Sequence, residues 1–386
     1  MVSMNVLNRT NLQDDYLHSL LISLLRGLAA LEVAAAHLRA QVYPGYGLIE
    51  HPTVWFQGFA FVTGFAHQAV ILFFLLSGWL VGGSLLNKNG TMGAIKHYFI
   101  DRISRLWVVL VPTFVLVLAI GILTGKVDAQ VASVAPGNDY SATAFIGNLV
   151  GLQDLAVPTF GGNFPLWSLS NETWYYIMFP LLVVAGTARS RWRRSVAIVG
   201  LTALCWFLSG TILLYFTIWL MGAGCSRIKI EAGASMRWLF FFIFAMIAIY
   251  FRMRGWTNGI GTETFLQDYI FSVAFLLFLA STQQHLPVNS VRFMKVKQLT
   301  KFFADFSFTL YVLHVPLIGL VVFLNPYLNA NLLSANNPFH LALYLVLYAA
   351  IVAASYLFHL PFERNTHRLR SYFKHVANTE KPVIQT

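Results

Sequence analysis

Long apolar stretches recur along the whole chain, and they constrain its fold more than any other feature. Ten of them approach the roughly 20 apolar residues that a helix needs to cross a bilayer. They cover residues 17–40, 66–87, 103–124, 167–187, 195–209, 211–226, 236–252, 266–283, 302–323 and 339–360. Only 11% of the residues are charged, against about 25% in a soluble domain, which leaves too few polar side chains to cover a soluble globule. The sequence therefore predicts an all-α, polytopic membrane helix bundle.

The apolar stretches are spaced closely enough to predict one integral membrane domain over residues 1–386. We expect a cytoplasmic N-terminal segment at 1–16, a basic cytoplasmic tail at 361–386, and no fused extracytoplasmic domain. The first stretch contains Arg26 and Glu32, charges that the apolar region of a cleavable signal peptide would not tolerate. It is therefore predicted to be retained as the first helix.

The basic residues separate the apolar stretches and so predict an orientation in the membrane. With the N-terminus inside, 21 of the 26 Lys and Arg residues fall in inner segments, and only Lys126, Arg252 and Arg254 fall in outer loops. Because cytoplasmic loops carry an excess of Lys and Arg, this bias predicts both termini in the cytoplasm. In a soluble protein the net charge of +11 would suggest nucleic acid as a partner. Here the basic residues separate apolar stretches, which is the pattern of loops that face an anionic leaflet, so we expect membrane lipid and no nucleic acid as a partner.

Two further regions are interpreted from composition. The stretch 145–155 is too short to span and is expected to be re-entrant or interfacial. The outer loop 125–165 is rich in Gly, Pro, Asn and Asp, which fits either an acceptor site or a mobile surface loop.

Cys205 and Cys225 lie in apolar stretches without metal-ligand spacing, so we interpret them as packing residues and predict no metal site.

The first apolar stretch carries the ionisable residues Arg26, Glu32 and His37, each of which is a candidate for function inside a bilayer. At 100° per residue, Arg26 and His37 share one helix face and lie about 16 Å apart along the axis. A histidine is a natural general base near neutral pH, and an arginine suits an anionic or carbonyl group. A purely structural Arg and His, satisfied by neighbouring helices, fits the same spacing.

Five segments, taken in chain order, carry recognisable motifs. They are the Arg26-x10-His37 pair, 73–80 (FFLLSGWL), Arg102 with Arg105, 164–172 (FPLWSLSNE) and 307–316 (SFTLYVLHVP). Together they resemble the motifs of the membrane acyltransferase 3 family, although Pro112 falls later than in the family pattern and Glu32 is not part of it. The resemblance implies transfer of an acyl group, commonly acetyl, from cytosolic acyl-CoA to a hydroxyl of an exported or surface carbohydrate. It also implies residence in a bacterial cytoplasmic membrane.

The resemblance further implies roles for individual residues. His37 is expected to be the general base, Glu172 to orient the imidazole or the sugar hydroxyl, and Arg26 to hold the pantetheine or the thioester oxyanion. Arg102, Arg105 and Ser77 are expected to bind acyl-CoA. His67, Trp167, Ser170 and His314 are expected to face the acceptor.

Several alternatives remain open at this point. Glu172 also fits a surface carboxylate near a helix start, and Arg102 and Arg105 also fit ordinary positive-inside anchoring. For the whole chain, a secondary transporter or flippase for glycans would use the buried Arg, Glu and His as a proton relay, but the sequence shows no convincing internal repeat. A catalytically silent relative is the third candidate, and the intact motifs argue against it.

Overall fold

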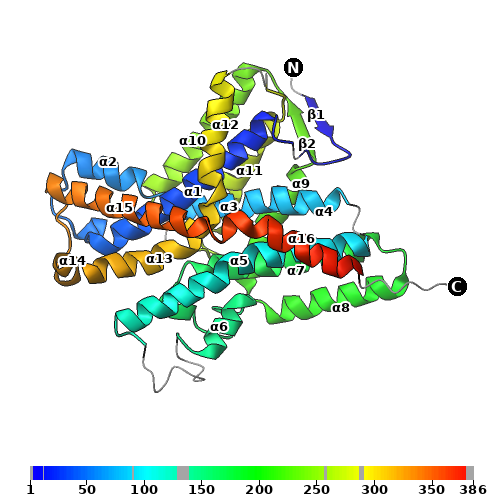
Figure 1. Cartoon of the computed structure of the whole chain (residues 1–386). Helices are drawn as coiled ribbons and strands as arrows, with labels where there is room; N and C mark the ends of the chain where they lie inside the picture. Colours follow the sequence, from blue (N-terminus) through cyan, green and yellow to red (C-terminus); the bar gives the residue numbers. More distant parts are fainter. Residues whose placement is uncertain are drawn as a thin grey trace.

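The computed structural model of the chain describes residues 3–11, 13–88, 91–127, 139–255, 259–286 and 291–379. Helix accounts for 76% of it, which confirms the all-α class, and Figure 1 shows the elements. The helices are α1 (Leu17–Val42), α2 (Val54–Val62), α3 (Ala66–Ser77), α4 (Gly83–Leu86), α5 (Met92–Leu123), α6 (Ala142–Leu149), α7 (Leu166–Thr187), α8 (Arg191–Phe207), α9 (Gly210–Cys225), α10 (Ala234–Met253), α11 (Phe265–Ser281), α12 (Val291–Asp305), α13 (Ser307–Leu324), α14 (Pro326–Ala330), α15 (Pro338–His359) and α16 (Thr366–Thr379). The strands are β1 (Ser3–Val6) and β2 (Ile228–Glu231).

The ten predicted apolar stretches fall largely in helical segments, although 66–87 and 302–323 are each divided between more than one helix. Six helical segments of the described chain are long and apolar enough to cross a membrane, and α9 and α11 are shorter apolar helices. The six are Leu17–Leu48, Val54–Leu86, Gly93–Leu123, Ala234–Met253, Ser307–Leu324 and Pro338–Val376. The count of ten spans and the cytoplasmic position of both termini remain predictions.

Two boundaries differ from those expected. Helix α5 begins at Met92 rather than near 103, because Oγ1 of Thr91 accepts a hydrogen bond from N of Ala94 at 3.3 Å and caps the helix start. The stretch 302–323 is divided at Phe306, where α12 ends and α13 begins in another direction (Figure 1). The backbone leaves the α-helical conformation at Phe306, where φ is −108° and ψ is 9°, and the chain changes direction there.

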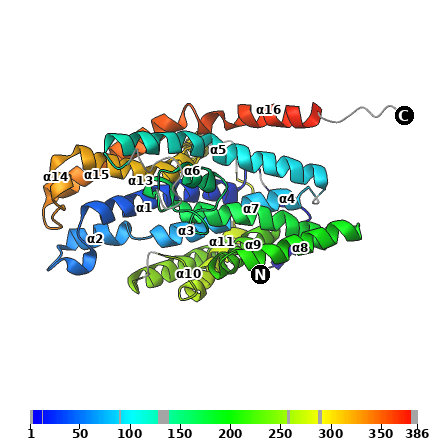
Figure 2. The ribbon, with the colours of Figure 1, turned by 90° about the horizontal axis from the view of Figure 1, so that it is seen from below.

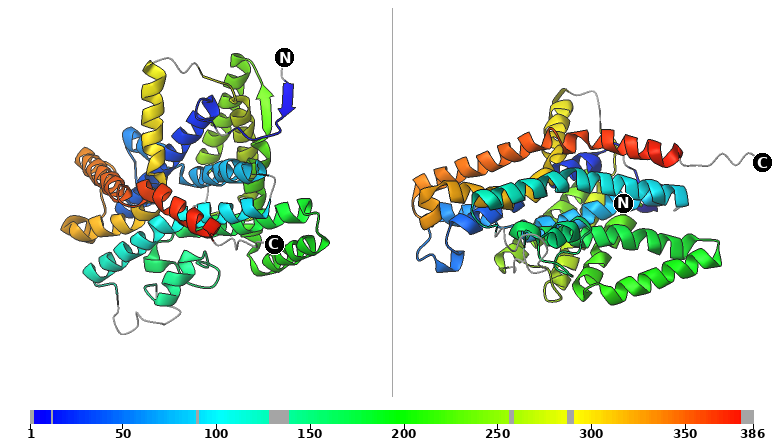
Figure 3. Two further views of the ribbon diagram at one scale, coloured as in Figure 1. Left: turned by 45° about the vertical axis from the view of Figure 1, so that its right-hand side comes forward. Right: turned by 60° about the horizontal axis from the view of Figure 1, so that its bottom comes forward.

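The two ends of the chain pair with other parts of the molecule. Strand β1 pairs antiparallel with β2, with Ser3 opposite Glu231 and Val6 opposite Ile228. Helix α16, within the predicted tail, lies along α5 (Figure 3), where Asp101 is 3.4 Å from Nε of Arg370. The predicted terminal segments otherwise include residues 1–2, 12 and 380–386, which lie outside the described residues.

Close backbone packing positions the middle of the bundle. A π-helical segment, Gly78–Gly82, continues α3 toward α4 and packs on α9. A Cβ atom on Gly78 would lie 2.0 Å from the carbonyl oxygen of Trp219, so only glycine allows this approach. The contact lets Nε1 of Trp219 donate to Oγ of Ser77 at 3.1 Å. The motif around Ser77 and Gly78 thus has a packing function.

Helix α1 lies inside the bundle and packs against α3, α12, α13 and α15, as Figure 2 shows from below. Two tyrosines of α15 donate hydrogen bonds at 2.9 Å to α1 carbonyl oxygens, Tyr344 to Ala35 and Tyr348 to Leu31. These contacts hold the helix that carries Arg26 and His37, and the two residues face separate cavities.

Candidate functional site

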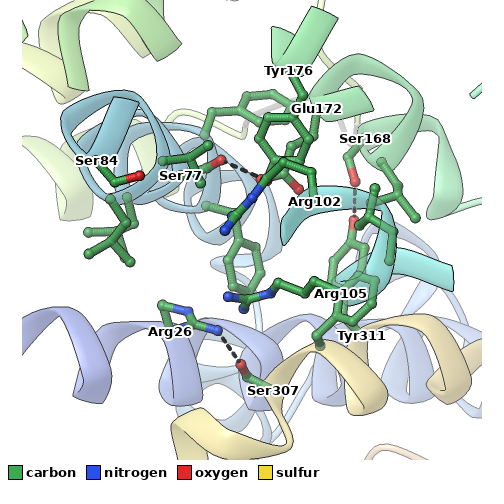
Figure 4. Close-up of a pocket in the computed structure, with 18 residues that line it drawn as sticks. Arg26, Ser77, Ser84, Arg102, Arg105, Ser168, Glu172, Tyr176, Ser307 and Tyr311 are labelled. Atoms are coloured by element: carbon green, nitrogen blue, oxygen red, sulfur yellow. Dashed lines mark hydrogen bonds between the residues drawn. The ribbon is translucent and has the colours of Figure 1, made fainter. Parts of the chain in front are cut away.

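The first cavity, which we call the Arg26 cavity, lies among α1, α3, α5, α7 and α13 and has a volume of about 210 Å³. Its polar lining consists of Arg26, Ser77, Ser84, Arg102, Arg105, Ser168, Glu172, Tyr176, Ser307 and Tyr311. Figure 4 shows the guanidinium groups of Arg26, Arg102 and Arg105 converging on one space. The sequence motifs of five separate helices therefore meet in one place.

A hydrogen-bond chain orders one wall of the Arg26 cavity. The hydroxyl of Tyr176 donates to Oε1 of Glu172 at 2.5 Å and lies 3.2 Å from Oγ of Ser77. The guanidinium carbon of Arg102 lies 5.8 Å from the centre of the Tyr176 ring, a cation–π distance. Nε of Arg102 is buried and has no hydrogen-bond partner among the described residues. Three cations thus face a single carboxylate, which suits an anionic or strongly polar ligand.

Glu172 lines a cavity that His37 does not line, and its expected role toward the acceptor hydroxyl stays a prediction. It lines the Arg26 cavity, and no hydrogen bond within the described chain joins it to His37. It is not at the helix start either, because α7 begins at Leu166 with Pro165 as its N-cap. Glu172 therefore belongs with the arginines rather than with the imidazole.

A second opening, the basic vestibule, adjoins the Arg26 cavity because Arg26 and Arg105 line both. It has a volume of about 350 Å³, and its ionisable lining residues are Arg26, Arg105, Lys301, Asp305, His359, Glu363, Arg364 and Arg370. Sequence reasoning counted the residues of the tail only for topology and missed that Glu363, Arg364 and Arg370 return to the site. The amphipathic α16 was the available signal.

The half-buried His37 and the fully buried His314 form a pair toward the C-terminal end of α1. Nδ1 of His37 lies 2.7 Å from Nε2 of His314, and Nδ1 of His314 lies 3.2 Å from the carbonyl oxygen of Leu310. A carbonyl oxygen only accepts, so Nδ1 of His314 carries a proton and its Nε2 accepts from Nδ1–H of His37 when both rings are neutral. This leaves Nε2 of His37 unprotonated, with no protein partner among the described residues. A fixed tautomer with a free lone pair is what a general base requires.

A proline in α13 helps to place His314. Pro316 has no N–H for the carbonyl of Val312, and Nδ2 of Asn163 donates to that oxygen instead, at 2.8 Å. The hydroxyl of Tyr311 lies 2.6 Å from Oγ of Ser168. Residues 163–168 and the motif 307–316 therefore fix each other's positions through these hydrogen bonds.

His37 lines two cavities that are distinct from the Arg26 cavity. The Lys126 cavity, about 550 Å³, includes His37, Lys126, Asp139, Tyr140 and Phe164. The described parts of the outer loop 125–165 thus reach His37, while residues 128–138 lie outside the described residues.

The Arg252 cavity is the other space lined by His37. Its volume is about 360 Å³, and its lining includes His37, Arg39, Gly64, His67, Trp167, Arg252 and Tyr311. Tyr311 also lines the Arg26 cavity, so the two cavities share this residue in their walls.

The remaining predicted acceptor residues differ in position. His67 lines the Arg252 cavity, and its Nε2 lies 2.7 Å from Oδ1 of the fully buried Asp268. Trp167 lines the same cavity. Ser170 lines none of the cavities described here, because its Oγ donates to the carbonyl oxygen of Gly151 at 2.7 Å. Sequence reasoning missed Asp268, which a lone carboxylate in the apolar stretch 266–283 could have signalled.

Comparison with known proteins gives one finding. A family model described as an acyltransferase domain matches residues 20–360. The match extends from the start of α1 to the end of α15 and contains the Arg26 cavity, the two cavities at His37 and the His37–His314 pair. No curated protein and no solved structure matches the chain.

Proposed function

This chain belongs to the membrane acyltransferase 3 family, and from that premise we propose that it is an O-acyltransferase of a bacterial cytoplasmic membrane. Its acyl donor is cytosolic acyl-CoA, most simply acetyl-CoA, and its acceptor is a hydroxyl of an exported or surface carbohydrate. The family membership makes it an integral membrane acyltransferase. The donor, the acceptor and the base are our proposals.

The cavities on the Arg26 side suit the donor. The basic vestibule offers five Lys and Arg side chains against two carboxylates, a setting that favours the phosphates of CoA. The Arg26 cavity continues from it and would take the pantetheine arm, directing the thioester toward Tyr311. Of the two roles expected for Arg26, donor binding is better supported than oxyanion stabilisation, because Arg26 and His37 lie about 16 Å apart along α1.

The His37 side suits the chemistry. An acceptor hydroxyl in either cavity at His37 would donate a hydrogen bond to Nε2. As its oxygen bonds to the thioester carbonyl carbon, the proton passes to Nε2, the C–S bond breaks, and the proton then goes to the CoA thiolate. His314 keeps Nδ1–H of His37 engaged throughout and is a positioning residue. General base catalysis of this kind contributes about 10²–10⁴-fold to the rate.

The single observation that carries this proposal is the orientation of the His37–His314 pair at the wall of two cavities. The buried His314 fixes the proton of His37 on Nδ1. The unprotonated nitrogen, Nε2 of His37, is therefore on the ring that lines the two cavities. A merely structural histidine pair does not require an open space on either side.

The test uses protein reconstituted in sealed vesicles. Labelled acetyl-CoA is added on the side of the basic vestibule and candidate glycans are enclosed within. We expect label to appear on glycan inside the vesicle, with one CoA released for each acetyl group transferred. Movement of glycan across the membrane without acyl transfer would contradict the proposal and favour a transporter.

A further inference from the structure

Two arginines meet in the Arg252 cavity on the side where the orientation predicts few cations. Arg39 comes from the end of α1 and Arg252 from the end of α10, and both line the cavity together with His37. Basic residues on the cytoplasmic side need no further explanation in a membrane protein. Arg39 and Arg252 lie on the opposite side, so the positive-inside rule does not explain why arginines occur there.

Both guanidinium groups are held against the backbone around residue 60. Nη2 of Arg252 donates to the carbonyl oxygen of Ala60 at 2.8 Å, and Nη2 of Arg39 donates to that of Thr63 at 3.4 Å. Gly64 makes the approach possible, because a Cβ atom there would lie 2.1 Å from Nη2 of Arg252. Nε of Arg39 is buried without a hydrogen-bond partner in the described part of the chain. The backbone carbonyls thus hold both guanidinium groups in place, and Nε–H of Arg39 remains available as a hydrogen-bond donor.

The local charges leave this pair of guanidiniums incompletely balanced. Glu32 is close enough to both for electrostatic attraction, but its Oε1 accepts from N of Phe65 at 2.7 Å and it does not line the cavity. Asp268 is fully buried behind His67 and Tyr215. No carboxylate is found among the described residues that line the Arg252 cavity. An excess of cations in a partly desolvated space favours an anionic ligand.

We propose that the Arg252 cavity binds an acidic group, a carboxylate or a phosphate, on the acceptor. The enzyme would then act on acidic rather than neutral glycans, with the acid on Arg39 and Arg252 and a hydroxyl of the same or a neighbouring sugar at His37. Trp167 in the same lining offers a flat apolar face to the sugar ring. The assignment of His37 rests on the proposed function, whereas the anion site rests on the two arginines.

The anion site is tested without acyl transfer. Purified protein is treated with an arginine-selective dicarbonyl reagent in glucuronate, glucose 6-phosphate or glucose, all at one ionic strength, and modification is measured by peptide mass spectrometry. We expect the anions to slow modification of Arg39 and Arg252 at least about threefold, a change of under 1 kcal/mol, and glucose to have no effect. Arg254, which stacks on Tyr250 outside the cavity, is the internal control.

Each outcome of this assay decides something. Protection by glucuronate alone indicates a sugar acid, protection by glucose 6-phosphate alone indicates a phosphorylated or lipid-linked sugar, and both support the proposal. Equal protection by glucose, no protection by any probe, or equal protection at Arg254 would overturn it.

Two variants at Arg252 test whether the protection of Arg39 depends on the second cation. Arg252→Gln should abolish protection of Arg39, while Arg252→Lys should retain part of it, because lysine keeps the charge without the forked geometry. Equal protection of Arg39 in both variants would contradict the proposal. Labelled acetyl transfer is measured separately, so loss of transfer with intact anion protection would count against the proposed function alone.

Discussion

Arginines line cavities near both Arg26 and His37 of α1. The two groups differ in how strongly their positions indicate a bound ligand. Around Arg26, the cations lie on the predicted cytoplasmic side, where topology alone would place them. Around His37, Arg39 and Arg252 lie on the opposite side, against that bias. A cation in the first region is therefore weak evidence of a ligand until geometry supports it. A cation in the second region runs against the bias, and it indicates a ligand when it also lines a cavity, as Arg39 and Arg252 do and Arg254 does not.

Geometry supplies the missing evidence at the Arg26 end. The guanidiniums of Arg26, Arg102 and Arg105 converge on one cavity (Figure 4), whereas an anchoring residue such as Arg189 is exposed at the turn between α7 and α8. We propose that convergence on a cavity, rather than the presence of charge, distinguishes a binding arginine from an anchoring one.

The largest expected effect after loss of His37 itself belongs to His314. His314→Phe removes the acceptor for Nδ1–H of His37 and should lower kcat about 100-fold, since it frees the ring to adopt the wrong tautomer. KM for acetyl-CoA should change little. His314→Gln keeps an acceptor atom and should recover part of kcat. Equal loss in both variants, or a rise in KM, would show that His314 only supports packing.

At the Arg26 end, Arg102→Ala should raise KM for acetyl-CoA about tenfold and lower kcat less, because it removes binding that ground and transition states share. Steady-state kinetics at saturating acceptor measure the split. Arg189→Ala is the matched control and should leave both constants near wild type. A fall in kcat at unchanged KM would remove Arg102 from the donor site.

At the His37 end, Glu32→Gln should tighten binding of acidic probes about threefold, because it removes a competing negative charge while an amide oxygen still accepts from N of Phe65. Protection of Arg39 and Arg252 from modification, titrated with glucuronate, measures this. Weaker binding in the variant would mean that Glu32 holds the arginines in place rather than competing with the ligand.

The smallest effect is expected at Ser170. Ser170→Ala removes the hydrogen bond to Gly151 and should lower the free energy of unfolding by about 1 kcal/mol. Thermal denaturation in detergent measures it. Acceptor KM should stay unchanged, and a clear rise would restore Ser170 to the acceptor site.

The fold could be predicted largely from apolar length, because a bilayer demands helices of about 20 residues. The pairing of Arg26 with His37 on one face followed from helical periodicity. The division at Phe306 was missed because an apolar window does not register a change in helix direction. The two-stranded sheet was missed because its strands have only four residues each.

The sequence indicated which residues line the cavities better than it indicated which of them lie together. Periodicity within one helix reveals which residues share a face, but not which neighbouring helix that face meets. For this reason Glu172 was expected near His37 and lies among the arginines, and Ser170 was expected at the acceptor and bonds to Gly151. Glu363 and Arg370 reach the vestibule only because the chain folds back along α5 after α15.

The central claim is that Nε2 of His37 accepts the proton of the acceptor hydroxyl. Its most direct test compares wild type with His37→Ala in labelled acetyl transfer at saturating donor and acceptor, with acetyl-CoA binding measured on the same samples. We predict a loss of transfer of at least about 100-fold with donor binding unchanged. Full turnover by the variant, with the same product, would contradict the account.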